Sequence, residues 1–129
     1  MKLSDVASNI AANVICKRLD GGQIEIYGGT QPGRPEEEVV TKCLARLSFS
    51  PKSFKDAVKG VSRANAIGEG TVEVAGKATW FRAVSAKGDP VFDGSVGVSK
   101  FSDITLSETD LKIGDTLKID MFEFVFKPS

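Results

Sequence analysis

The sequence predicts a mainly β fold: an antiparallel β-sandwich, jelly-roll-like or barrel-like, with one N-terminal α-helix. Three observations support this prediction. The first twenty residues place apolar side chains at helical spacing, whereas later segments alternate polar and apolar residues. Turn signals rich in glycine recur about every ten residues, as in all-β domains. The 129 residues have the length of one domain, residues 1–129. We divide it into a helical arm, residues 1–21, and a β-sandwich body, residues 22–129.

The helical arm has a start signal, an apolar stripe and a stop signal. Ser4 is a suitable N-cap, and Asp5 would face the positive end of the helix dipole. Gly21 and Gly22 then favour the end of the helix. The stripe either packs on the protein's own sheet or docks on a neighbouring subunit. It consists of Leu3, Val6, Ala7, Ile10, Ala11 and Val14.

The first half of the body reads as two strands and two loops. Residues 23–27 alternate and predict a strand, and residues 31–35, with two prolines, predict a loop. Glu36, Glu37 and Glu38 extend that loop as a solvated charge run. Residues 39–49 predict a longer, half-buried strand that contains Cys43.

The segment 52–60 is mostly polar, and we expect a loop with one short helical turn. Phe54 and Val58 are its expected apolar anchors.

The second half of the body predicts short strands, at residues 61–67, 71–75, 77–85, 91–96 and 104–106. In the last strand the apolar phase changes after Met121. Leu117 and Ile119 lie in one phase, and Phe122 and Phe124 lie in the other. A strand with a period of two needs an extra residue to change face, so we expect a β-bulge or sharp bend near Met121–Phe122.

The predicted core lies between two sheets. Trp80 and Phe81 are adjacent and should point to opposite faces, so one enters this core and the other lies under the helix or is exposed to a partner. The other expected core residues are Ile24, Ile26, Leu47, Val84, Leu117 and Ile119.

The composition argues against catalysis and against metal or cofactor chemistry. The chain has no histidine, which removes the histidine-based nucleophile pairs and metal ligands. Cys16 and Cys43 are too few for a four-thiolate zinc site, and we expect both to be small buried apolar groups. We expect no enzymatic activity, no bound metal ion and no cofactor. The candidate carboxylates for acid–base catalysis are Asp93, Asp103, Glu108, Asp110 and Asp115.

The charge balance and the apolar runs also limit the partners. Lys+Arg and Asp+Glu are 17 each, so the net charge is zero, which disfavours nucleic-acid binding. No stretch has the length and apolarity of a membrane span. Asp5, Asn9 and Asn13 interrupt any signal-peptide core. We therefore expect synthesis in a cytoplasm.

Three segments together resemble small proteins of tailed-bacteriophage and prophage genomes. Residues 22–32 are similar to the opening of those proteins, residues 76–82 with 91–97 to their central hairpin, and residues 104–119 to their C-terminal part. That family is described as virion-structural or of unknown role, and it supplies no catalytic residues. Lys100-Phe101 and the glutamates at 36–38 depart from its pattern. The resemblance implies a location in the virion.

From this resemblance and the missing chemistry we expect a non-enzymatic virion protein, in the first place a capsid cement or decoration protein. The alternatives are a head–tail or tail component, or a carbohydrate- or receptor-binding module that uses an exposed aromatic side chain. The expected partners are other virion proteins and further copies of the chain. The candidate contact residues are Leu3, Val6, Ile10, Val14, Phe122, Phe124 and Phe126.

Overall fold

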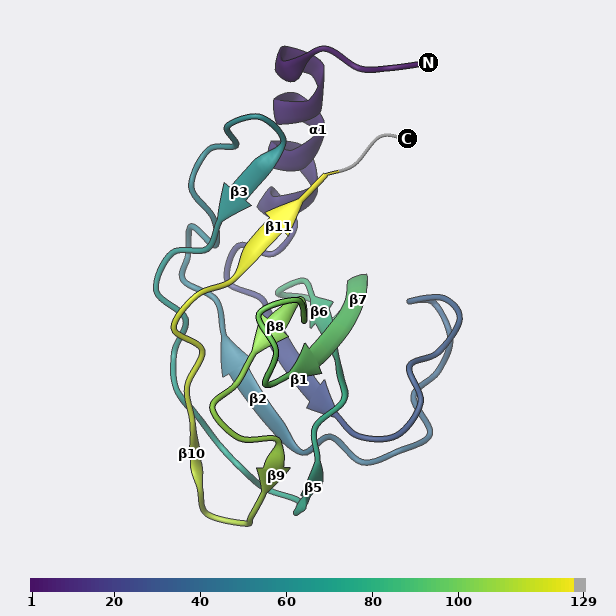
Figure 1. Cartoon of the computed structure of the whole chain (residues 1–129), viewed down its shortest axis with the longest axis vertical. Helices are drawn as coiled ribbons and strands as arrows, with labels where there is room; N and C mark the ends of the chain where they lie inside the picture. The colour runs from purple at the N-terminus through teal and green to yellow at the C-terminus, as the bar shows by residue number, and fades with distance from the viewer. Residues whose placement is uncertain (127–129) are drawn as a thin grey trace.

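A single helix and eleven short strands make up the computed structural model, which describes residues 1–126 (Figure 1). The chain is mainly β with one N-terminal helix, which confirms the prediction at that level. Residues 127–129 of the predicted domain lie outside the described residues. The elements are α1 Asp5–Lys17, β1 Gln23–Tyr27, β2 Ala45–Ser48, β3 Val61–Arg63, β4 Gly70–Thr71, β5 Gly76–Lys77, β6 Trp80–Val84, β7 Pro90–Gly97, β8 Ile104–Thr105, β9 Asp110–Leu111, β10 Thr116–Leu117 and β11 Glu123–Val125.

The largest sheet has the strand order β2-β1-β6-β7-β8. Its first four strands pair antiparallel, and β8 is parallel to β7. Three two-stranded ribbons, β3–β11, β4–β10 and β5–β9, complete the body. An isolated bridge between Ile104 and Phe122 links β8 to the residue before β11. The strands therefore continue from the large sheet into the β3–β11 ribbon, which lies beside α1 in Figure 1.

The core covers one face of the five-stranded sheet. Ile24 is paired with Leu47 on one side and with Ala83 on the other, so these side chains share a face. Residues of the three ribbons pack onto this face. All six residues predicted for the core are buried: Ile24, Ile26, Leu47, Val84, Leu117 and Ile119.

Trp80 and Phe81 are both buried, with 2% and 1% of their surface exposed, so the expected exposed or helix-covered aromatic is absent at these two positions. Phe81 belongs to the main core cluster. On the other face of the sheet, Trp80 stacks on Tyr27 with ring centroids 4.6 Å apart, and its indole N–H donates to the carbonyl of Gly28 at 3.0 Å.

The strand predicted for residues 39–49 is much shorter in the structure. β2 begins only at Ala45, while Val40 is 94% exposed and Cys43 lies outside the strand. The partner strand explains the difference. β1 ends at Tyr27, so residues 39–43 have no neighbouring strand with which to pair. The segments 61–67, 71–75 and 77–85 also contain shorter strands than predicted.

Residues 52–60 form one arm of a hairpin rather than a helical turn. Val58 and Val61 exchange main-chain hydrogen bonds of 2.9 and 3.0 Å around the two-residue turn Lys59-Gly60. Phe54 is buried as predicted, but Val58 is 69% exposed, and Ala57 is buried in its place. Phe54 and Ala57 lie three positions apart, so strict strand alternation does not explain which side chains are buried. The hydrogen bond from the Ala57 N–H to Asn13 instead holds this part of the arm against α1.

The predicted last strand is broken into two strands at the point where its apolar phase changes. β10 and β11 are separate, and the exposed pair Asp120-Met121 lies between the buried residues Ile119 and Phe122. The chain bends at Asp120. The predicted bend is therefore confirmed, although Met121 is exposed rather than in phase with Ile119.

Candidate protein-binding surfaces

The ends of α1 follow the predicted signals. The Ser4 hydroxyl oxygen accepts a hydrogen bond from the Ala7 N–H at 3.1 Å, and Asp5 and Lys17 occupy the first and last turns. After the helix Gly21 has a φ of +69°, which favours glycine. These interactions fix where the helix begins and ends.

The face that attaches α1 to the body is made of small and polar residues. Ser8, Ala12 and Cys16 are buried. The amide oxygen of Asn13 accepts from the Ala57 N–H at 2.7 Å, and that of Asn9 accepts from the Gly60 N–H at 2.8 Å. α1 is therefore held against the hairpin that contains β3 partly by side-chain to main-chain hydrogen bonds.

The opposite face of α1 carries the predicted apolar stripe. Its large side chains are exposed, whereas Ala7 and Ala11 are half-buried. Residues two positions apart on a helix, such as Ile10 and Ala12, point to different sides. The exposed fractions are 41% for Leu3, 69% for Val6, 59% for Ile10 and 61% for Val14. Of the two alternatives that the sequence left open, packing on the protein's own sheet is wrong for these four residues. We call them the α1 stripe; three of them lie on α1, and Leu3 lies just before its N-cap Ser4.

The C-terminal phenylalanines do not form a single exposed face. Phe122 is 3% exposed and makes edge contacts with Phe81 and Phe54, so its role as a contact residue is wrong. Phe124 and Phe126 are half-buried. Phe122 is buried because its bridge to Ile104 draws it into the core.

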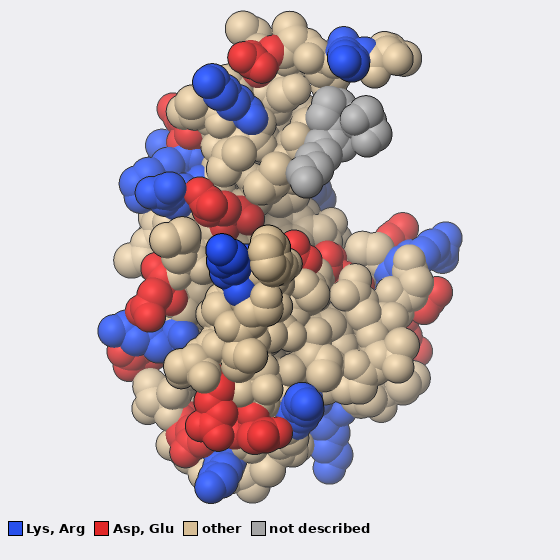
Figure 2. All heavy atoms as spheres, in the orientation of Figure 1, with Lys and Arg blue, Asp and Glu red and all other residues tan. Residues whose placement is uncertain are grey.

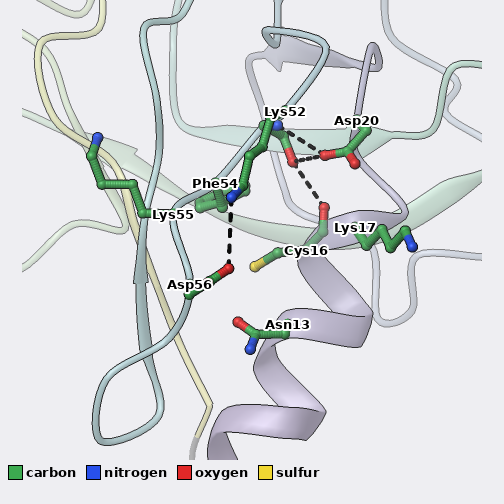
Figure 3. Close-up of a pocket in the computed structure, with 9 residues that line it drawn as sticks. Asn13, Cys16, Lys17, Asp20, Lys52, Phe54, Lys55 and Asp56 are labelled. Atoms are coloured by element: carbon green, nitrogen blue, oxygen red, sulfur yellow. Dashed lines mark hydrogen bonds and ion pairs between the residues drawn. The ribbon is translucent and has the colours of Figure 1, made fainter.

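A hollow of about 350 Å³ lies where the C-terminal end of α1 meets residues 52–56 (Figure 3). The Ser53 hydroxyl oxygen lies 2.8 Å from a carboxylate oxygen of Asp20 and 2.9 Å from the carbonyl oxygen of Cys16, and the Ser53 N–H donates to the same Asp20 oxygen. Lys52 and Asp56 form an exposed ion pair. The contacts of Ser53 with Cys16 and Asp20 therefore join residues 52–56 to the end of α1 and the residues that follow it.

Neither cysteine has the properties of a nucleophile. Both are free thiols; Cys16 is buried and Cys43 is half-buried. Burial raises the pKa of Cys16 to about 11, and burial also raises the pKa of Cys43. A thiol with a raised pKa is protonated at neutral pH and reacts slowly. The expectation of a buried apolar group is therefore confirmed for Cys16 and only partly for Cys43.

The carboxylates considered for acid–base chemistry have structural partners in several cases. Asp93 is paired with Arg82, Asp103 accepts from the N–H of Ser95, and Asp115 accepts from the N–H of Lys112. Among residues 1–126, no three histidine, cysteine or acidic side chains lie close enough together to hold a metal ion. No helix in that range could cross a membrane.

The Arg82–Asp93 pair is a buried feature that sequence reasoning missed. It lies on the second face of the large sheet, where Arg82 also donates to the carbonyl of Glu37 at 2.7 Å. Glu37 belongs to the long connection between β1 and β2, which projects to the right in Figure 1. The pair could have been found only by aligning β6 with β7, where Arg82 and Asp93 are direct partners.

On the face drawn in Figure 2, basic and acidic side chains are interspersed, and no broad basic surface is present. Comparison of the chain with protein-family models, with curated proteins and with solved structures finds no match. The resemblance to tailed-bacteriophage proteins therefore gains no support from these comparisons, and the assignment to a virion stays a prediction.

Proposed function

We propose that this protein is a non-enzymatic structural subunit that binds a neighbouring protein through the α1 stripe. One observation carries the proposal: α1 is attached by its polar face while Val6, Ile10 and Val14 are each more than half exposed. A helix that needed only intramolecular packing would turn its apolar side inward. An arrangement with the apolar side outward favours a partner on that side.

The free energy gained by burying the α1 stripe against a partner is sufficient for a weak contact that is repeated in many copies. Burial of a Val, Leu or Ile side chain contributes roughly 1.5–3 kcal/mol when it is complete. The α1 stripe is already partly shielded, so its gain per residue is smaller. Contacts of this strength hold a subunit firmly when many copies bind together.

The assembly that we propose is a tailed-phage virion, with the capsid as first choice and the subunit acting as cement or decoration protein. The family resemblance of residues 22–32 and 104–119 supports this choice. A head–tail or tail location is the alternative. The carbohydrate- or receptor-binding alternative is weakened, because the Trp80 ring is buried and cannot stack on a sugar.

We also propose that the body is best grouped with sandwich- or barrel-like folds. In support, Leu117 of β10 and Phe122, the residue before β11, lie in the core on the apolar face of the five-stranded sheet, and Phe124 of β11 packs against it. The link through Ile104 and Phe122 supports a curled arrangement.

The test is incorporation of variants into particles produced from the genome that encodes the chain. Ile10→Asp with Val14→Asp places two charges on the α1 stripe. Val40→Asp with Ile113→Asp is the matched control, because these residues are 94% and 71% exposed and lie outside α1. Circular dichroism checks that both variants fold.

We expect mass spectrometry to find the wild-type chain and the control in purified particles. We expect the α1 variant to be reduced at least about tenfold. Absence of the wild-type chain from particles would overturn the virion assignment. Normal incorporation of the folded α1 variant would show that α1 is not the docking element.

A further inference from the structure

The curled sheet has an open position for one strand, between β7 and β11. β8 pairs with β7 only at Val96 and Gly97, and Phe122 then pairs with Ile104. β8 runs parallel to β7 and antiparallel to the chain at Phe122. Residues 90–95 of β7 therefore run opposite residues 123–125 of β11. In the described part of the chain no strand pairs with either segment on this inner side.

The main-chain groups on both sides of this position point into it. Along a strand, successive residues direct their N–H and C=O groups to alternate edges. The N–H of Val96 donates to the carbonyl of Thr79, the residue before β6, so the N–H groups of Asp93 and Ser95 point away from β6. On β11 the N–H of Phe126 donates to Gly60, so the N–H of Val125 points away from β3.

Asp103 occupies one end of the open position and takes over the hydrogen bonding of a missing strand. Its carboxylate oxygen Oδ2 accepts from the Ser95 N–H at 2.9 Å and from the Ser95 hydroxyl at 3.2 Å. Residues 98–103, which would extend β8 in this direction, form a turn instead. The remaining edge toward Asp93 is open.

The floor of the open position is aromatic. A hollow of about 420 Å³ is lined by residues of β7 and β11. The rings of Phe92 and Phe124 stack there at 5.1 Å, and Phe92 also meets Phe81 and Phe122 edge-on at 6.2 Å. A Cβ atom on Gly94 would lie 2.5 Å from the Phe81 ring, so this position keeps glycine and the hollow stays deep. Figure 2 shows the surface hollowed between the upper part with α1 and β11 and the lower body.

The rim of the hollow is acidic. The carboxylates of Asp103 and Glu123 line it; Asp103 accepts from Ser95, and Glu123 forms an exposed ion pair with Arg63 of β3. A second hollow that shares both residues continues the groove past Asp120. Lys100 is the one basic residue that lines either hollow. An occupant with basic side chains would complement this rim, and apolar side chains would fit the aromatic floor.

We propose that this groove, the β7–β11 groove, binds an extended segment of a partner protein that pairs as a strand and alternates apolar with basic residues. Peptides commonly bind by adding a strand to an open sheet edge, with side-chain pockets that supply specificity. This inference rests on the proposed function and deepens it, because it names a second contact and the chemistry of the partner segment.

The test is an NMR titration of the full chain, labelled with nitrogen-15, with three synthetic peptides of about ten residues. One peptide alternates lysine and valine, the second alternates glutamate and valine, and the third has the first sequence interrupted by prolines. We expect the lysine–valine peptide to shift the amide signals of Asp93, Glu123 and Val125 and to slow their hydrogen exchange. We expect the other two peptides to bind at least about tenfold more weakly.

A matched pair of chain variants tests the acidic rim. Asp103→Asn with Glu123→Gln should weaken binding of the lysine–valine peptide at least about tenfold, and Lys100→Gln should not weaken it. The proposal is overturned if the three groove amides do not respond at millimolar peptide, or if the proline-interrupted peptide shifts them equally. A response confined to α1 would support the proposed function and overturn the groove. Incorporation of the α1 variant into particles would overturn the α1 contact and leave the groove result standing.

Discussion

Arg82 and Asp93 form a bidentate ion pair between the neighbouring strands β6 and β7. Nε of Arg82 lies 2.7 Å from Oδ1 of Asp93, and a terminal guanidinium nitrogen lies 3.0 Å from Oδ2. Their side chains are only 7% and 3% exposed. The hydrogen bonds to Asp93 raise the pKa of Arg82, which stays charged. The guanidinium also donates to the carbonyls of Glu37 and Arg34, so one buried charge joins two strands to the connection between β1 and β2.

Arg82→Met should therefore be strongly destabilising. It leaves the Asp93 carboxylate buried without a partner, and loss of one member of a buried pair costs about 3–5 kcal/mol. Arg63→Met is the control, because the Arg63–Glu123 pair is exposed and such pairs contribute below about 1 kcal/mol. Urea unfolding measures both. Equal losses in the two variants would contradict the argument.

The same Arg82 substitution should loosen the connection between β1 and β2. Limited proteolysis by a glutamate-specific protease at Glu36–Glu38 should become faster relative to cleavage elsewhere, since the guanidinium no longer holds the carbonyls of Arg34 and Glu37. An unchanged cleavage rate at Glu36–Glu38 would mean that other contacts order this connection.

Asn13→Ala should detach part of α1. The substitution leaves the N–H of Ala57 without its acceptor, and an unpaired buried donor costs about 1–3 kcal/mol. Val14→Ala is the matched control at the next position, where the side chain is 61% exposed, and it should change stability by less than about 0.5 kcal/mol. Hydrogen exchange of the α1 amides, with urea unfolding, distinguishes the two variants. Similar protection in both would show that Asn13 does not hold the helix.

How much the sequence could predict depends on the range of the interactions. The alternation around Ile24 and Ile26 is local, and the core side of β1 followed from it directly. The N-cap at Ser4 is equally local, and its hydrogen bond is present. The α1 stripe was identified from its spacing, but spacing does not say which face is covered.

The parts that sequence reasoning missed depend on contacts between distant residues. Asn13 binds Ala57, 44 residues away, so the attaching face of α1 could not be read from periodicity. Burial of Phe122 requires the bridge to Ile104, and the groove beside it requires knowing that β8 begins only at Ile104. One missed feature was readable locally, since the two residues Lys59-Gly60 between Val58 and Val61 are a signal for a hairpin turn.

Cys16 should make stability fall at alkaline pH. Burial raises its folded pKa from 9.0 to about 11. Between these values the unfolded chain loses the thiol proton and the folded chain keeps it, so the unfolded state gains stability as pH rises. The stability that the protonated Cys16 thiol contributes to the folded state is complete below pH 9 and is lost as the pH rises toward 11. Cys16→Ala should be less stable at pH 7 but should have a flatter profile from pH 9 to 11 in urea unfolding. Parallel profiles would show that the thiol does not titrate differently in the two states.

Lys59→Asn should stabilise the protein. Lys59 is the one non-glycine residue with positive φ in the described chain, at +52°, and Gly60 follows at +77°. Positive φ at both central residues is the geometry of a type I′ hairpin turn, for which Asn-Gly is strongly preferred. The left-handed region costs an ordinary residue roughly 1–2 kcal/mol, and asparagine tolerates it better. We expect a gain of about 0.5–1 kcal/mol by urea unfolding. Lys87→Asn is the control, because it also precedes a glycine of positive φ, Gly88, but does not itself have positive φ. It should give no comparable gain, and an equal gain there would assign the effect to the loss of a positive charge rather than to the backbone of the turn.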